Sequence, residues 1–127
     1  MNTAIIALGS NIDPEQNIKD AQELIAKSFS ITGSSAFIKT KPVGFTDQND
    51  FLNGSIAIET NLDMAGLKKE LKTLESRLHR QSSPIKFGPR TIDLDIVVFN
   101  GKVVDQDFYE REFLKNAVLQ IMPDLKY

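Results

Sequence analysis

Two aspartates separated by a single residue stand in the strand-like apolar stretch 92–99. Side chains of a β-strand alternate between its faces, so Asp93 and Asp95 project from one face and the flanking Ile and Leu side chains from the other. Neighbouring carboxylates repel each other unless a cation lies between them. Mg²⁺ suits such a pair, because it binds one or two carboxylates and completes its shell with water and phosphate oxygens. The spacing predicts a magnesium–phosphate site; an ordinary strand with a solvated acidic face is the alternative.

The residues just before the aspartates favour the first interpretation. Gly88-Pro89 is typical of a turn that leads into the strand. Arg90 follows it and supplies a planar guanidinium, which is well shaped for phosphate oxygens.

Length and composition limit the fold and the function. A chain of 127 residues is expected to form one domain, 1–127. The net charge of −2 disfavours nucleic acid or a membrane surface as the general partner. The absence of cysteine excludes disulfides and thiol chemistry. With no basic segment or long apolar run at the N-terminus, a cytoplasmic location is predicted.

Apolar spacing predicts the first elements around the aspartates. A continuous apolar run at 4–8 predicts a buried strand. Asp13 and Pro14 predict a helix start, with Asp13 as the N-cap and Pro14 at the first helical position. A strand is predicted at 34–40, followed by a long polar loop at 41–50 of the kind that often carries function.

The second half repeats this pattern. Residues 51–60 alternate as a strand does, and a helix is predicted to begin after the cap Asp63. The apolar face of this helix is formed by Leu67, Leu71, Leu74 and Leu78. Asn100-Gly101 predicts a tight turn before a short strand at 103–104. The order predicts an α+β, ferredoxin-like sandwich, in which helices pack on one face of a four-stranded antiparallel sheet and the other face is free for a site.

Two pairs of residues near strand ends are candidate ligand contacts. Phe51 and Asn53 point the same way, so that one offers a ring to stack on a flat heteroaromatic ligand and the other a carboxamide to pair with it. Routine cross-strand packing is the alternative. Ser10 and Asn11 close the first strand; they could contact a ligand or only shape the turn.

Nine residues in a row, Gly88-Pro89-Arg90-Thr91-Ile92-Asp93-Leu94-Asp95-Ile96, resemble the signature of the 6-hydroxymethyl-7,8-dihydropterin pyrophosphokinase family. Gly9-Ser10-Asn11 is a second match. The resemblance implies an enzyme of folate biosynthesis that moves pyrophosphate from ATP to the pterin hydroxymethyl group, using two Mg²⁺ held by Asp93 and Asp95. ATP and the pterin are then the partners, and a monomer or weak homodimer is expected.

The resemblance also implies which residues form the site. The pterin would contact residues before, on and beyond the strand at 51–60, namely Thr40, Pro42, Val43, Gly44, Phe51, Asn53 and Phe113. ATP would contact Glu75, Arg80, Lys86, Phe87, Arg90, Ile96 and Arg111. The catalytic set would be Arg80, Arg90, Asp93 and Asp95, and the last two would bind the metal.

The sequence departs from the family pattern in several places. Phe51, Lys86 and Phe87 stand where Tyr, Arg and Trp are commoner. The segment 105–110 is shorter than usual and lacks a histidine that binds the nucleotide, with Asp105 the nearest counterpart. The shorter segment and the missing histidine weaken the expectation of ATP affinity more than that of pterin binding.

Other interpretations stay open. His79, the only histidine, is interpreted as a solvated helix residue that pairs with Glu75. Arg80 also suits a helix C-terminus without any ligand. For the whole chain, the alternatives are a non-catalytic pterin-binding relative and a nucleic-acid-binding module. The sequence disfavours the second, because it has neither a basic excess nor the aromatic-rich RNA-binding segments.

Overall fold

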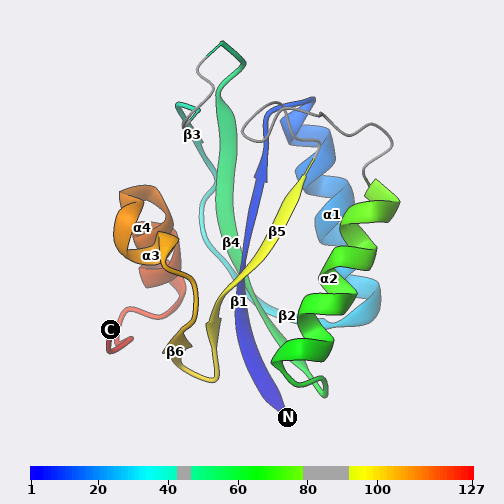
Figure 1. Cartoon of the computed structure of the whole chain (residues 1–127), viewed down its shortest axis with the longest axis vertical. Coiled ribbons are helices and arrows are strands. Elements are labelled where there is room, and N and C mark those ends of the chain that lie inside the picture. The colour runs from blue at the N-terminus through cyan, green and yellow to red at the C-terminus, as the bar shows by residue number, and fades with distance from the viewer. Residues whose placement is uncertain (43–46, 79–91) are drawn as a thin grey trace.

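Six antiparallel strands form one sheet in the part of the chain that the computed structural model describes, residues 1–42, 47–78 and 92–127 (Figure 1). In chain order the elements are β1 (Asn2–Ser10), α1 (Pro14–Ser28), β2 (Ser30–Ser34), β3 (Ile38–Thr40), β4 (Phe51–Thr60), α2 (Met64–Leu78), β5 (Asp93–Phe99), β6 (Lys102–Val103), α3 (Asp107–Glu110) and α4 (Glu112–Ile121). The order across the sheet is β2-β4-β1-β5-β6, and β3 pairs with the beginning of β4. No helix in the described ranges is both long and apolar enough to cross a membrane.

The prediction of an α+β fold with an antiparallel sheet is confirmed, but the prediction of four strands is wrong. The stretch 34–40 is not one strand, because Ser35 interrupts the ladder. Its backbone N–H donates to the carbonyl of Ser55 at 2.9 Å, while its own hydroxyl accepts the N–H of Ser55 at 2.9 Å. A side chain thus replaces a backbone acceptor, and the stretch divides into the end of β2 and a separate β3.

Helices α1 and α2 cover one face of the sheet and bury the main core (Figure 1). Alternation along β1 and β4 turns Ile6, Leu8, Ile56 and Ile58 toward these helices, and each is at most 1% exposed. The predicted stripe of α2 packs against them, with Leu67, Leu71 and Leu74 buried and Leu78 partly buried. This layer fixes the three central strands on which the site is built.

The two helix starts turned out differently. Asp63 caps α2 as predicted, because its carboxylate accepts the N–H of Gly66 at 2.7 Å. Asp13 stands at the N-cap position of α1 with a left-handed backbone (φ 40°), but its side chain makes no capping hydrogen bond. The side chain of Asn17 instead donates to the carbonyl of Ile12. Pro14 opens α1 as expected.

The second face of the sheet is not free, contrary to the prediction, because α3 and α4 pack across part of it (Figure 1). A smaller core forms there, in which Phe108 and Val118 are fully buried against Ile5 and Val97. The β5–β6 hairpin precedes these helices in the chain. Its turn is formed, as predicted, by Asn100-Gly101, whose residues both have positive φ (49° and 79°). The opposite end of this face stays open and forms a pocket.

Candidate active site

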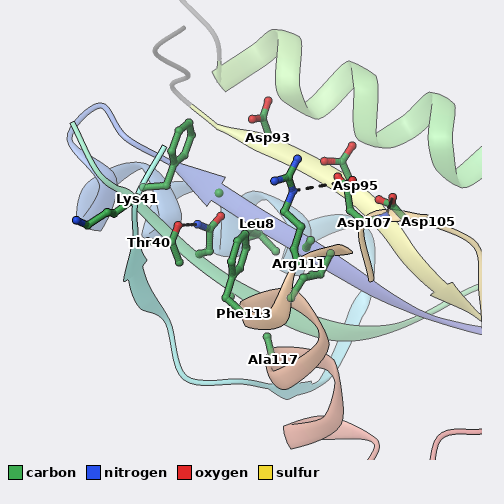
Figure 2. A pocket seen from close by; sticks show the side chains of 16 residues that line it. Leu8, Thr40, Lys41, Asp93, Asp95, Asp105, Asp107, Arg111, Phe113 and Ala117 are labelled. Carbon is green, nitrogen blue, oxygen red and sulfur yellow. Dashed lines mark hydrogen bonds and ion pairs between the residues drawn. The ribbon is translucent and has the colours of Figure 1, made fainter. Parts of the chain in front are cut away.

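A pocket of about 240 Å³ lies between the α3–α4 pair and the ends of β1, β4 and β5 (Figure 2). Small-molecule pockets usually measure about 300–1,000 Å³, so this one suits a compact ligand. Its walls come from segments far apart in the sequence, and the helix pair that closes one side follows directly from the β5–β6 hairpin.

Strand register brings the predicted residues of β4 and β5 to the same place. Gly9 on β1 pairs with Asn53 on one side and with Asp93 on the other. Two residues earlier, Ala7 pairs in the same way with Ser55 and Asp95. The carboxamide and the two acids therefore share one face of three adjacent strands, as the alternation predicted.

Gly9 allows Asn53 to lie on this face of the three strands. A Cβ at that position would lie 2.5 Å from Oδ1 of Asn53, closer than any real contact allows. The missing side chain lets the carboxamide of Asn53 lie across β1, and its Nδ2 donates to Oγ1 of Thr40 on β3. The amide is thus held in one orientation at the pocket wall.

Two aromatic rings line the same pocket from opposite elements. Phe51 comes from the first residue of β4 and Phe113 from the first turn of α4, and both are partly exposed to the cavity. Pro42 is described but does not line the pocket. Val43 and Gly44, the other two residues expected at the pterin, lie outside the described residues.

The other end of the pocket is strongly acidic. Four carboxylates among the described residues line it, those of Asp93, Asp95, Asp105 and Asp107 (Figure 2). The described residues supply only two cations to its lining, Lys41 and Arg111. Arg111 lies between α3 and α4, and its Nε is 3.9 Å from Oδ1 of Asp107, a distance at which the pairing is weak.

The charge imbalance acts most on Asp95. Burial is the largest cause that raises the pKa of Asp95, from its ordinary 3.8 to about 6. The nearby carboxylates add to this rise in the order Asp93, Glu75 and Asp105, while Lys72 lowers it. Part of the side chain still reaches solvent at the pocket mouth, so water screens some of this repulsion. An added cation would relieve the rest.

Divalent magnesium fits this set of donors. No three His, Asp or Glu side chains in the described ranges are grouped to hold a metal by themselves. Mg²⁺ does not require such a group, because it uses one or two carboxylates together with water and phosphate oxygens. Asp93 and Asp95, adjacent on one strand face, provide that pair.

A second cleft, of about 390 Å³, adjoins the first at Asp95 and Asp105. It lies between α2 and the segment after β6, and Ile96 and Lys72 line it. Ile96 was expected at the nucleotide, whereas Lys72 was not anticipated. Glu75 lines neither cleft.

Several sequence predictions fall on residues that the structure leaves undescribed. The basic and aromatic side chains expected at the phosphates, Arg80, Lys86, Phe87 and Arg90, lie outside the described residues, as does His79. Among the implied ATP contacts, Glu75, Ile96 and Arg111 are described, and only Arg111 lines the acidic pocket itself.

Other pocket residues escaped the sequence analysis. The small side chains of Ala7 and Gly9, which alternate with the bulky Ile6 and Leu8, were a readable signal of a hollow on that face. Asp107 gave no comparable signal, because it reaches the pocket only through the packing of α3.

Ser10, the last residue of β1, and Asn11, which follows it, make contacts within the protein. Ser10 and Asn11 are buried and do not line the pocket. The side chain of Asn11 donates to Oε1 of Gln48 at 2.7 Å and to the carbonyl of Asn49 at 3.1 Å. In the described structure these residues therefore shape the turn and hold the loop before β4.

The fold and the pocket define an α+β protein with a small-molecule site in which an aromatic, amide-bearing end meets an acidic end. The family model for 7,8-dihydro-6-hydroxymethylpterin-pyrophosphokinase matches residues 5–123. The 2-amino-4-hydroxy-6-hydroxymethyldihydropteridine pyrophosphokinases of Bacillus subtilis and Campylobacter jejuni are 35% and 38% identical to the chain. Each alignment covers 94% of the chain, and 78% and 79% of those proteins, respectively. A folate synthesis bifunctional protein of Arabidopsis thaliana is 35% identical over 95% of the chain and 26% of its own length. The chain belongs to the 7,8-dihydro-6-hydroxymethylpterin-pyrophosphokinase family.

Proposed function

We infer that the chain transfers pyrophosphate from ATP to 6-hydroxymethyl-7,8-dihydropterin, giving AMP and the pterin diphosphate, in folate biosynthesis. The observation that carries this conclusion, in a chain of this family, is the strand register across Asn53, Gly9 and Asp93. It puts a group that can pair with a flat ring beside a group that can bind a metal and phosphate.

The aromatic end of the pocket is the proposed pterin site. The ring would stack between Phe51 and Phe113, which line the cavity from β4 and α4. Asn53 would pair with polar atoms of the ring, and its bond to Thr40 would hold the carboxamide in place. Three residues of the preceding loop, Pro42, Val43 and Gly44, complete the proposed set.

The acidic end is the proposed site for ATP. Asp93 and Asp95 would hold two Mg²⁺ ions, which when bound would neutralise phosphate charge and make the β-phosphorus more electrophilic. The nucleotide would extend into the second cleft, along Ile96. Glu75, Arg80, Lys86, Phe87, Arg90 and Arg111 are proposed as further ATP contacts, among which Arg80 and Arg90 would be catalytic.

The pocket's own groups would position the reacting atoms. The pterin hydroxyl oxygen attacks the β-phosphorus of ATP, the bond from that phosphorus to the oxygen shared with the α-phosphorus breaks, AMP leaves with that oxygen, and the hydroxyl proton is released. Holding both substrates across Gly9 converts this encounter into a reaction within one complex. Arg111, partly buried at 29% side-chain exposure, would offset charge on the phosphates.

The proposal also covers domain organisation, cellular location, oligomeric state and fold relationship. We propose a single domain over 1–127, cytoplasmic, acting as a monomer or weak homodimer, with neither nucleic acid nor membrane as a partner. A ferredoxin-like relationship is supported by the order β5-β1-β4-β2 of four strands and by α1 and α2 on one face.

The function is tested by incubating the protein with ATP, Mg²⁺ and 6-hydroxymethyl-7,8-dihydropterin and measuring AMP. Asp93→Ala is expected to reduce AMP release by at least about a hundredfold, because it removes half of the carboxylate pair. Pterin affinity, measured by calorimetry, is expected to stay within about threefold, since the ring binds at the other end of the pocket.

Asp20→Ala on α1 is the matched control and should retain full turnover. A wild-type protein that binds the pterin but releases no AMP would instead be a non-catalytic relative. Retained turnover in Asp93→Ala would contradict the metal assignment.

A further inference from the structure

Among the residues that the structure describes, the outer edge of β5, the strand that carries the two aspartates, is only partly paired. β5 pairs with β1 along most of its length, but β6 meets it only at Val98 and Phe99. Leu94, which lies between the two aspartates, is beyond the reach of β6. Its backbone N–H donates to Oε2 of Glu75 at 2.8 Å. A side chain of α2 thus takes the place of a neighbouring strand at this point.

Glu75 is well placed to hold this bond. Its side chain is only 13% exposed, and the preceding turn of α2 is anchored by the buried Leu71 and Leu74. Its other oxygen, Oε1, lies 3.9 Å from Nζ of Lys72, a side chain that is 71% exposed. That ion pair is weak, whereas the bond from an N–H to a half-buried carboxylate is strong.

The negative charge of Glu75 acts on the acid pair. It is one of the charges that raise the pKa of Asp95, so it opposes the ionised acid pair. Glu75 lines neither of the two clefts, and its bond to Leu94 ties its carboxylate to the backbone of β5.

We propose that Glu75 is a positioning residue for the acid pair. Its hydrogen bond to Leu94 fixes the backbone of β5 between Asp93 and Asp95, so that both carboxylates project into the pocket at a constant separation. The inference rests on the proposed function of those two aspartates. This task is separate from the nucleotide contact proposed above for Glu75.

Two conservative variants separate these tasks. Glu75→Gln keeps an oxygen at the same distance from the N–H of Leu94 but removes the charge. Glu75→Asp keeps the charge but withdraws the carboxylate by one carbon–carbon bond. Neither substitution adds volume inside the core, so both variants should fold.

The positioning role predicts that Gln at position 75 preserves the hydrogen bond to the Leu94 N–H and that Asp does not. In Glu75→Gln, the exchange rate of the Leu94 amide measured by NMR should stay within about threefold of wild type. In Glu75→Asp, the Leu94 amide should exchange at least about tenfold faster, and kcat should fall at least about tenfold because the carboxylates are misplaced. Calorimetric affinity for Mg²⁺ should fall too, while pterin affinity should not change.

The opposite ranking overturns the proposal. If Glu75→Asp is active and Glu75→Gln is not, the charge acts directly on the nucleotide or the metal. Unchanged Leu94 exchange in Glu75→Asp would equally contradict the role. Glu70→Gln, an identical change elsewhere on α2, is the matched control and should alter none of these quantities. Amide exchange and Mg²⁺ affinity need no turnover, so a wild-type protein that releases no AMP would count against the proposed function alone.

Discussion

The two faces of the sheet differ in the size of the side chains that its central strand presents to them. Toward α1 and α2, β1 turns Ile6 and Leu8, which are almost completely buried. Toward α3 and α4 it turns Ile5, Ala7 and Gly9, whose side chains become smaller along the strand. The second face is therefore packed at one end and hollow at the other, so that one strand serves both a core and a pocket.

The two faces differ in charge as well. Among the described residues, no charged side chain is fully buried under α1 and α2. The open end of the other face gathers four carboxylates, although their mutual repulsion works against folding. Packing that maximises stability and charge that serves a ligand are thus separated onto opposite faces of the same strands.

The largest expected effect comes from opening a cavity on the filled face. Ile56 is 0% exposed and pairs with Ile6 in the centre of the sheet. Ile56→Ala should lower the free energy of unfolding by about 2–5 kcal/mol, measured by urea denaturation, because the packed surroundings cannot close the gap. Ile38→Ala, at a side chain that is 46% exposed, should cost less than about 1 kcal/mol. Equal losses at the two sites would show that the core is not packed as described.

A smaller but more specific effect is expected from filling the hollow face. The new Cβ in Gly9→Ala would push against the flexible end of Asn53, whose amide can rotate away at little cost to folding. Stability should change by less than about 1 kcal/mol, whereas pterin affinity should fall at least about tenfold, because a polar group of the ring loses its partner. Calorimetry with the pterin alone measures this.

Gly101→Ala is the contrasting control. Gly101 has open space around it, but its φ of 79° is unfavourable for a residue that has a Cβ. It should destabilise by about 1 kcal/mol and leave pterin affinity unchanged. Loss of pterin affinity in both variants would mean that the effect at Gly9 is not local.

Periodicity and register explain which parts could be predicted from the sequence. The strand at 51–60 has the predicted bounds, and Phe51 and Asn53 share a pocket because side chains two residues apart must lie on one face. Asp93 and Asp95 lie on the same face as Asn53 for the same reason, because β1 pairs with both β4 and β5. The family signature added the chemistry, which fold and alternation alone do not contain.

The errors arose where a tertiary contact outweighs the local pattern. Ser35 divides a predicted strand through a bond to a distant residue, Ser55, which no local window reveals. The cover by α3 and α4 depends on buried contacts such as Phe108, not on strand alternation. The contact between Glu75 and Leu94 was not predicted, because it depends on the packing of α2 beside β5.

The smallest expected effect tests whether the acidic end is costly without its ligand. The pKa of Asp95 is about 6 in the folded protein and 3.8 ordinarily, so the folded state binds more protons between these values. Stability therefore falls as pH rises through this window, and the full cost is present above about pH 6. Asp95→Asn should raise the free energy of unfolding at pH 7.5, without Mg²⁺, by about 1 kcal/mol, a figure reduced for the solvent that reaches Asp95.

The dependence of the stability gain on pH separates this explanation from a general effect of the Asn side chain in Asp95→Asn. The gain in Asp95→Asn should shrink as the pH is lowered from about 6 toward 3.8 and vanish below it, because both states of the wild type are then protonated. Mg²⁺ with ATP should stabilise the wild type and not the variant, since the ligand binds the ionised pair. Urea denaturation across this pH range measures both, with Asp124→Asn at an exposed site as the control. A gain that is constant with pH would contradict the link between repulsion at Asp95 and the cost of keeping the second face open.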